Sequence, residues 1–151
     1  MINREKLLTG MEDRRILFGS LLSLSNLLQT TLDRFFSEIT SKQFFLLICT
    51  ELFSEHDPSL SELAEVMQSS HQNIKQLVLK LEKNGIVRTY NDETDRRIIR
   101  VKTTEKKNLL DKKYNLSSSK AMDTMFSGID QKEITVTLKT ILHIEQNLLS
   151  V

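Results

Sequence analysis

The feature that most constrains the fold of this chain is a change in the spacing of its apolar residues near Gly85. Up to Lys83, apolar residues recur three and four positions apart, which indicates helices. Asn84-Gly85 then predicts a helix end, because glycine adopts positive φ without steric cost. The segments 86–90 and 98–103 are rich in β-branched residues and predict two strands. The polar segment 91–97 between them predicts a hairpin with a long tip.

Two short helices are predicted directly before this hairpin. The first covers roughly Ser61 to Met67. The second runs from Ser70 to Lys83, and Ser69 and Gln72 at its start have the spacing of a capping pair. Its apolar residues fall on one face: Ile74, Leu77, Val78 and Leu81. Two short helices joined by a tight turn and followed by a hairpin predict a winged helix-turn-helix.

Longer helices are predicted on both sides of this region. An apolar stripe predicts a helix from about Glu12 to Ser37: Leu17, Leu21, Leu24, Leu28, Leu32 and Phe35. Thr40 and Gln43 form a capping-box pattern. The helix that they begin should direct four residues inward, namely Phe44, Leu47, Ile48 and Leu52, and should end at His56-Asp57-Pro58. A further helix should begin after Thr103 or Thr104 and end at Gly128. The last helix should begin after Asp130, which forms a capping pattern with Glu133.

The expected fold class is therefore mainly α with a small β-hairpin wing. The last helix carries its own stripe: Ile134, Leu138, Ile141, Leu142 and Leu148. Together with the first helix it offers more leucine, isoleucine and phenylalanine than a monomer of 151 residues can cover. A tight homodimer is the consequence that we expect. A chain with one cysteine and no apolar run of 18 residues fits a cytoplasmic location away from membranes.

Charge is distributed unevenly along the chain. The whole sequence has a net charge of only +1, but Gln68 to Lys107 holds ten lysines and arginines against five aspartates and glutamates. A basic middle segment favours contact with nucleic acid. A solvated face of mixed charge is the alternative, and the charge distribution alone does not separate the two.

The helix from Ser70 to Lys83 has the side chains expected of a major-groove helix. Its candidate DNA-binding residues are Ser70, His71, Gln72, Asn73, Lys75, Gln76 and Lys80. Asparagine and glutamine can bond two edges of adenine at once, serine and histidine reach bases or phosphates, and lysine suits phosphates. An ordinary surface helix is the alternative interpretation.

The hairpin tip contains an arginine pair beside an acid. Asp95 can orient one guanidinium through a bidentate contact while the other reaches outward, and the candidates are Arg96 and Arg97. An arginine at a wing tip suits the narrow minor groove of A·T-rich DNA. The alternative is a surface ion pair that stabilises the turn by roughly 0 to 1 kcal/mol.

In order and spacing, the sequence resembles the MarR family of bacterial regulators. The matching segments are Leu63-Ala64-Glu65, Leu81-Glu82-Lys83-Asn84-Gly85, Asp95-Arg96-Arg97 and Thr104-Glu105-Lys106. The resemblance implies a homodimer with dimerisation helices in 1–39 and 104–151 and a winged helix-turn-helix in 40–103. It also implies binding to a pseudo-palindromic operator in double-stranded DNA and, in many members, repression that a small molecule releases. By position, Ser70 to Gln76 would enter the major groove and Arg97 would be the wing-tip arginine.

The sequence departs from the family pattern at three places. Gln68 and Ser69 stand where a glycine and an apolar residue are usual, and His71 to Asn73 replace the common arginine and threonine. Lys107 replaces the glycine that usually follows Thr-Glu-Lys. These departures make an operator sequence taken from relatives unsafe for this chain.

Other chemistry finds little support in the sequence. Cys49 lies among apolar residues and is expected to be a buried structural thiol, although a redox role stays open. The histidines are far apart and form no metal-binding pair, and no catalytic or cofactor motif is present, so we expect no metal, no cofactor and no enzyme activity. The rival function is a winged-helix scaffold whose groove-facing surface binds another protein instead of DNA.

Overall fold

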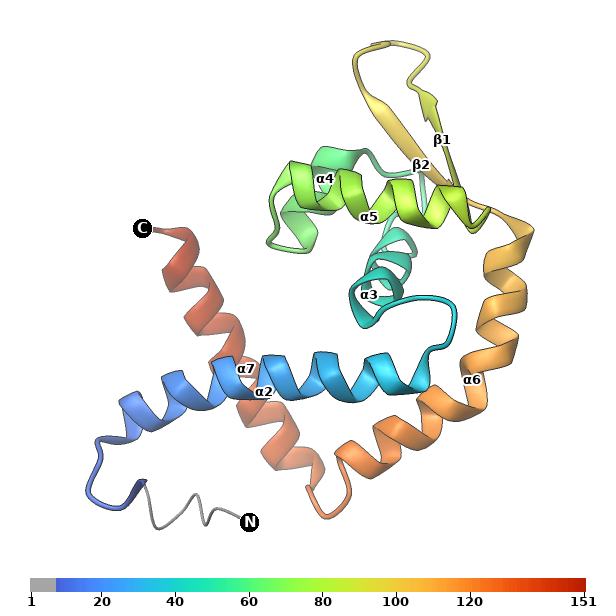
Figure 1. The fold of residues 1–151 in the computed structure, drawn as a ribbon. Helices are drawn as coiled ribbons and strands as arrows, with labels where there is room; N and C mark the ends of the chain where they lie inside the picture. Colours follow the sequence, from blue (N-terminus) through green and yellow to red (C-terminus); the bar gives the residue numbers. More distant parts are fainter. Residues whose placement is uncertain (1–7) are drawn as a thin grey trace. The chain divides into compact units, whose positions relative to one another are not determined.

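The computed structural model describes residues 8–151, without the side chains of residues 116 and 117. The chain divides into two compact units after Lys112. The first unit contains α2 (Asp13–Phe35), α3 (Ser41–Thr50), α4 (Leu60–Val66), α5 (His71–Lys83), β1 (Val87–Asn91), β2 (Ile99–Thr103) and the start of α6 (Glu105–Met125) (Figure 1). The second unit contains the rest of α6 and α7 (Gln131–Leu149). No helix in the described part of the chain is long and apolar enough to cross a membrane.

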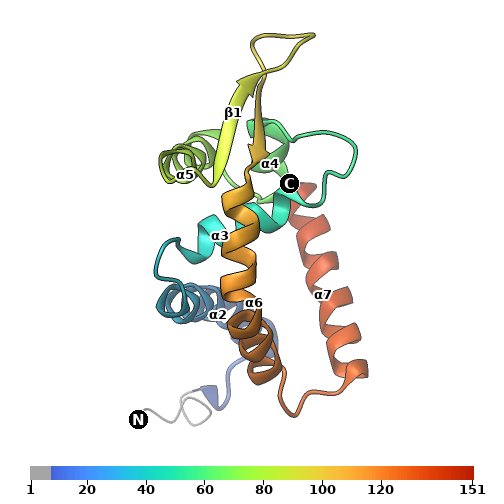
Figure 2. The same ribbon diagram turned by 90° about the vertical axis from the view of Figure 1, so that its right-hand side faces the viewer.

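The core of the first unit is a winged helix-turn-helix, as the sequence predicts. Helix α4 packs on α3 and α5, and α5 also contacts β1, so the hairpin and the three helices share one core. Its fully buried side chains include Leu46, Leu47, Leu63, Ile74, Leu81, Ile86, Val87 and Val101. The hairpin extends past α4 and α5 in both side views (Figures 1 and 2). The packing therefore leaves one face of α5 and the tip of the hairpin outside the core.

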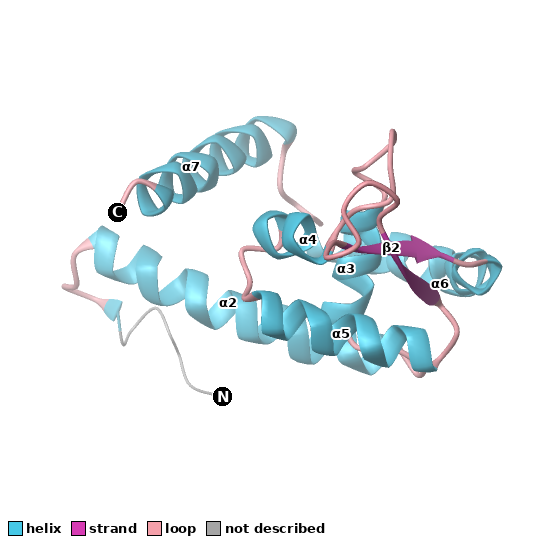
Figure 3. Cartoon of the chain, turned by 90° about the horizontal axis from the view of Figure 1, so that it is seen from above, coloured by secondary structure: helices cyan, strands magenta, loops and turns pink. Residues whose placement is uncertain are grey.

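The hairpin is tied to the helices by backbone bonds. Strands β1 and β2 pair in antiparallel register from Val87 opposite Thr103 to Asn91 opposite Ile99, and Figure 3 shows the long loop that joins them. On its other side, β2 meets the segment before α4, where the Val101 amide donates to the Pro58 carbonyl at 2.8 Å. This second contact anchors the base of the wing independently of its tip.

Among the described residues, three helices begin with a capping box. Thr40 with Gln43 begins α3, and Asp130 with Glu133 begins α7, as predicted. The third box, Ser59 with Glu62 at the start of α4, was not predicted. In each box the side chains at both ends bond the free backbone N–H groups of the first turn. The helix starts are therefore encoded locally.

The predicted cap of α5 is wrong by one residue. Ser70, not Ser69, is the N-cap, and its hydroxyl accepts from the Asn73 amide at 3.2 Å. Ser69 is still part of the preceding turn, because its amide donates to the Ala64 carbonyl at the end of α4. That bond closes α4 first, so the next helix can begin only one residue later.

The predicted inward face of α3 is also partly wrong. The helix ends at Thr50, well before His56-Asp57-Pro58, and its buried apolar residues are Leu46, Leu47 and Cys49. Phe44 is half-buried, while the side chains of Ile48 and Leu52 are 42% and 65% exposed. Because α3 contacts α2, α4, α5 and β2, its buried face is wider than a single stripe and is rotated from it. Leu52 lies beyond the helix, so the helical spacing does not apply to it.

Two helices in the first unit end in the same turn, one with glycine and one without. At the end of α5, the Gly85 amide bonds the Glu82 carbonyl and the Ile86 amide bonds the Leu81 carbonyl. Gln68 occupies the equivalent position after α4, and both residues are left-handed, with φ of 69° for Gly85 and 47° for Gln68. A side chain makes this conformation unfavourable by roughly 1–2 kcal/mol. Gln68 therefore carries local strain that Gly85 avoids.

We expect Gln68→Gly to raise the free energy of unfolding by about 1 kcal/mol and Gly85→Ala to lower it by a similar amount. A Cβ at Gly85 would meet nothing within 4 Å, so only the backbone conformation is penalised. Urea unfolding of the two variants measures both changes. Gln68→Ala is the matched control and should gain nothing, because alanine keeps the Cβ. Equal stability of the glycine and alanine variants at residue 68 would contradict this account.

The long helices carry apolar side chains that the chain itself leaves exposed. Neither α2 nor α7 contains a buried residue. The exposed apolar residues of α2 are Leu17, Phe18, Leu22, Leu24, Leu27 and Phe35, and those of α7 are Val136, Leu138, Ile141, Leu142, Leu148 and Leu149. Exposed apolar surfaces of this kind are typical of interfaces between protein chains.

The turn between the two last helices follows the sequence prediction. Gly128 has positive φ in the turn before α7, where a helix end was predicted.

Candidate nucleic-acid interface

The outer face of α5 is polar and free of acids in its first turn. All seven predicted DNA-binding residues of this helix are exposed: Ser70, His71, Gln72, Asn73, Lys75, Gln76 and Lys80. The four apolar residues predicted for the opposite face are buried in the core. The fold thus presents the first turn of α5 and one continuous polar face of the helix to solvent.

The two amide side chains at the start of α5 differ in their freedom. Asn73 donates one amide hydrogen to the Ser69 hydroxyl at 2.8 Å, across the turn between α4 and α5. Gln72 is exposed, and its amide makes no bond to the described residues. Gln72 therefore keeps its full set of donors and acceptors for a base edge, whereas Asn73 keeps only part of its own.

The wing tip holds one of its two arginines in a bidentate contact. The carboxylate of Asp95 accepts from Arg97 Nε at 3.0 Å and from Arg97 Nη2 at 2.8 Å. Arg97 is nonetheless 91% exposed. Arg96 is also exposed, and its carbonyl accepts from the Asn91 side chain at 2.7 Å. Asp95 therefore orients Arg97 and leaves Arg96 without this support, a choice that the sequence left open.

A third arginine, Arg100 in β2, links the wing to the helices and was not predicted as part of the site. Its side chain is only 20% exposed, and Nε donates to Asp92 at 2.7 Å while Nη1 donates to Glu62 at 3.1 Å. One signal was available in the sequence, because Arg100 interrupts the apolar run Ile98-Ile99-Arg100-Val101. A charge inside such a run indicates a partner, but it does not say which residue the partner is.

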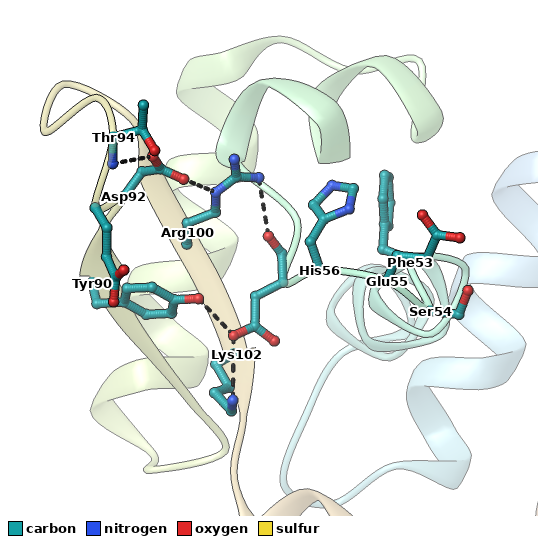
Figure 4. A pocket seen from close by; sticks show the side chains of 11 residues that line it. Phe53, Ser54, Glu55, His56, Tyr90, Asp92, Thr94, Arg100 and Lys102 are labelled. Carbon is teal, nitrogen blue, oxygen red and sulfur yellow. Dashed lines mark hydrogen bonds and ion pairs between the residues drawn. The ribbon is translucent and has the colours of Figure 1, made fainter.

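These ionic contacts border a pocket between the hairpin and the loop that follows α3 (Figure 4). Tyr90 donates its hydroxyl proton to Asp57 at 2.7 Å, and Lys102 lies 3.5 Å from the same carboxylate. Both cations of the lining, Arg100 and Lys102, are already paired with acids. The charged side chains Arg100 and Lys102 are therefore neutralised within the protein, and neither is a free cation for an anionic ligand.

The acids of this network are held in their charged form. Hydrogen bonds from the Asp95 amide, the Arg100 guanidinium and the Thr94 amide lower the pKa of Asp92 to about 2. Burial alone would raise the pKa of Glu62, but hydrogen bonds from Ser59 and His56 outweigh it and lower the pKa to about 2. At neutral pH both carboxylates are fully ionised.

We expect acid to weaken this network only well below neutral pH. The pKa values of Asp92 and Glu62 are depressed from 3.8 and 4.5 to about 2, so their contribution is complete above about 4.5 and is lost as the pH falls toward 2. Urea unfolding of the wild type and of Asp92→Asn over a pH series tests this. The difference in stability between the two should stay constant from pH 7 to pH 5 and shrink below pH 4. A difference that already shrinks at pH 6 would contradict this assignment.

Three other features singled out in the sequence are the Cys49 thiol, the possible metal ligands and Lys107. Cys49 is buried, and its burial raises the pKa of the thiol, which lowers its reactivity. Among the described residues, no group of three or more His, Cys, Asp or Glu side chains could hold a metal ion. Lys107, which departs from the family pattern, is buried and pairs with Glu51 and Asp111. That pairing ties the start of α6 to the end of α3.

Known proteins resemble this chain in sequence and in fold. Residues 39–99 match the sequence model of the MarR family. A MarR protein from Peptoclostridium difficile is 21% identical, with a TM-score of 0.78 over 93% of this chain and 92% of its own. A MarR/EmrR family transcriptional regulator from Acinetobacter sp. ADP1 is 12% identical, with a TM-score of 0.80 over 93% and 100%. MepR of S. aureus, solved in complex with DNA, is 17% identical, with a TM-score of 0.76 over 85% and 96%.

The match to the family lies on the segment that carries the site. It begins just before α3 and ends at Ile99 in β2, so it contains both α5 and the wing tip. The solved structures extend the likeness in fold over the flanking helices. Proteins of the MarR family are transcriptional regulators and not enzymes. Residues 39–99 are therefore a MarR-family winged helix-turn-helix, on a chain that has the fold of the MarR transcriptional regulators.

Proposed function

We propose that this chain is a cytoplasmic homodimer that binds a pseudo-palindromic operator in double-stranded DNA and represses transcription until a small molecule releases it. Residues 40–103 bind the DNA, and the helices in 1–39 and 104–151 form the dimer. The exposed apolar stripes of α2 and α7 support the second assignment, because a partner chain would cover them.

One observation carries the proposal: the exposed polar face of α5 and the exposed guanidinium of Arg97 belong to consecutive elements of one compact unit. A helix that enters the major groove needs polar side chains at its start that can reach base edges. The first turn of α5 has such side chains and no acid that would repel the phosphates. Lys75 and Lys80 on the same helix add positive charge for phosphates, which fix the position of the protein on the duplex. A wing-tip arginine suits the adjacent minor groove.

A small-molecule effector is supported by two solved relatives. PefR of Streptococcus agalactiae is a heme sensor solved with heme, and DNA binding by BpsR of Bordetella bronchiseptica is regulated by 6-hydroxynicotinic acid. These ligands differ in size and charge, so they support an effector without indicating its class.

Titration of duplex DNA from the region upstream of the chain's own gene, beside a random duplex, tests DNA binding. The regulator should bind the upstream duplex more tightly, and its affinity for both should fall steeply with salt, because each phosphate contact contributes about −0.9 to the logarithmic slope. Absence of binding at low salt would refute the proposal and favour the protein-binding scaffold. A footprint of the bound site should show two half-sites about 10 base pairs apart, as a two-fold dimer requires.

We expect Gln72→Ala to relax base preference at particular positions by about 1–3 kcal/mol, if its amide makes a bidentate contact. The effect of Asn73→Ala should be smaller, because Ser69 already takes one of its amide hydrogens. Affinities for a panel of single-base operator variants measure this. Gln131→Ala, at an exposed position of α7, is the matched control and should change no preference. A uniform loss across all variants would mean that Gln72 contacts phosphate instead of bases.

A further inference from the structure

Arg100 joins three parts of the first unit. Its guanidinium donates to Asp92 in the wing and to Glu62 in α4, and it also donates to the Asp57 carbonyl in the loop before α4 at 3.2 Å. Glu62 is itself fixed, because one of its oxygens accepts from the Ser59 amide at 2.7 Å. Arg100 therefore connects the wing to a carboxylate whose position α4 determines.

Asp92 passes this connection on to the wing tip. While Oδ2 accepts from Arg100, Oδ1 accepts from the amides of Thr94 and Asp95 at 2.9 and 3.1 Å. These two bonds fold the loop around the Asp92 side chain. Figure 4 shows Asp92 between Arg100 and Thr94. Asp92 thus helps to place Asp95, together with a backbone bond in which the Asp95 carbonyl accepts from the Ile98 amide at 2.9 Å.

Asp95 completes the path by holding Arg97. Besides the bidentate contact to the guanidinium, it accepts from the Arg97 backbone amide at 3.0 Å. A continuous chain of charged hydrogen bonds therefore runs from Glu62 in α4, through Arg100, Asp92 and Asp95, to Arg97. We call these five residues the wing relay.

We propose that Arg100 and Asp92 are positioning residues that set the orientation of the Arg97 guanidinium for DNA. The inference rests on the proposed function only for the DNA part. The wing relay begins at Glu62 in α4, and α4 packs directly on α5, which carries the groove-facing side chains. The relay therefore fixes the position of Arg97 relative to α5. An oriented arginine avoids the conformational entropy that a free side chain loses on binding, which corresponds to roughly three- to tenfold in affinity.

The relay acts on the tip of the wing and not on the hairpin as a whole. The base of the hairpin has its own support, since β1 and β2 are paired over five residues each and Val101 bonds Pro58. Loss of Arg100 should therefore leave the strands and the backbone bonds of Ile98 to Asp92 and Asp95 in place, and loosen the loop between Asp92 and Arg97. This separates a positioning role from a general role in folding.

Two variants of the full chain break the relay in different ways. Arg100→Met keeps most of the side-chain length and removes every donor, and Asp92→Asn keeps the shape of the side chain and removes its charge. In the free protein, ¹H–¹⁵N heteronuclear NOE values at Thr94, Asp95 and Arg97 should fall in both variants, with α4 and α5 unchanged. Lys102→Met removes a cation whose ion pair, among the described residues, is with Asp57 and not with Asp92 or Glu62. It is the control and should leave these amides as in the wild type.

A double-mutant cycle tests the link to DNA. Arg100→Met should weaken binding to duplex DNA by roughly three- to tenfold per subunit, and Arg97→Ala should cost less in the Arg100→Met background than in the wild type. Arg100→Lys should recover part of the affinity, because lysine can reach one acid.

Each arm of this experiment has a result that overturns the relay. Wing-tip NOE values that stay unchanged in both Arg100→Met and Asp92→Asn would refute it, whatever happens with DNA. Strictly additive effects of Arg97→Ala and Arg100→Met on DNA affinity would refute the claim that Arg100 acts on DNA binding through Arg97. A wild type that binds no DNA at low salt would refute the proposed function alone, since the NOE arm still decides whether the relay exists.

Discussion

Arg97→Ala is expected to weaken binding to the operator and to random DNA together and to reduce the salt slope by about one unit per subunit. The reason is the position of the guanidinium, which is 91% exposed at the tip and oriented by Asp95. At about 0.15 M salt, one released counterion corresponds to roughly fivefold in affinity, so a dimer should lose on the order of 30-fold. Titrations of both duplexes over a salt series measure the change.

Arg34→Ala and Arg96→Ala complete this experiment. Arg34 lies in the last turn of α2, and its removal takes away the same charge outside the winged helix, so the salt slope should not change. Arg96 lacks the contact to Asp95, so it would have to be ordered on binding and should contribute less than Arg97. An Arg97→Ala variant that is folded and keeps the wild-type slope would mean that the wing does not touch DNA.

Leu142→Glu should convert the dimer into a monomer at micromolar concentration. Leu142 is 45% exposed in the single chain and lies on the apolar stripe of α7 with Leu138 and Ile141. A two-fold dimer would bury this position in both copies, and an unpaired buried charge costs several kcal/mol. We therefore expect the dissociation constant of the dimer to rise by more than about 100-fold, with a parallel loss of operator affinity.

Thr140→Glu is the matched control for the dimer. Thr140 is an exposed residue of the same helix, and its hydroxyl donates to the Val136 carbonyl one turn earlier. The Thr140→Glu variant adds the same charge as Leu142→Glu but away from the apolar stripe. It should have the same mass as the wild type in light scattering from about 1 to 50 μM. A wild-type chain that is monomeric over this range would refute the homodimer, and a Leu142→Glu dimer would place the interface elsewhere.

The sequence by itself determined most of the secondary structure and the elements that present the candidate site. Helix starts at Thr40 and Asp130, the end of α5 at Gly85 and the two strands all follow from signals within a few residues. The four buried residues of α5 follow from their spacing alone, and so does the exposure of the polar face. Such features are predictable because backbone hydrogen bonds, turn conformations and a helical period are local properties.

The tertiary structure decided how these elements are joined. Only the fold shows that α3 buries Leu46 and Cys49, because contacts with four other elements choose its inner face. Only the fold places Arg100 against Glu62, which lies 38 residues earlier in the chain. Ion pairs of this kind have no periodic pattern in the sequence. A charged residue within an apolar run indicates that it has a partner, but the sequence does not show which residue that partner is. The elements that carry the candidate DNA-binding residues could therefore be predicted from sequence, and so could Asp95 as the partner of one wing arginine. The contacts of Arg100 with Asp92 and Glu62 could not.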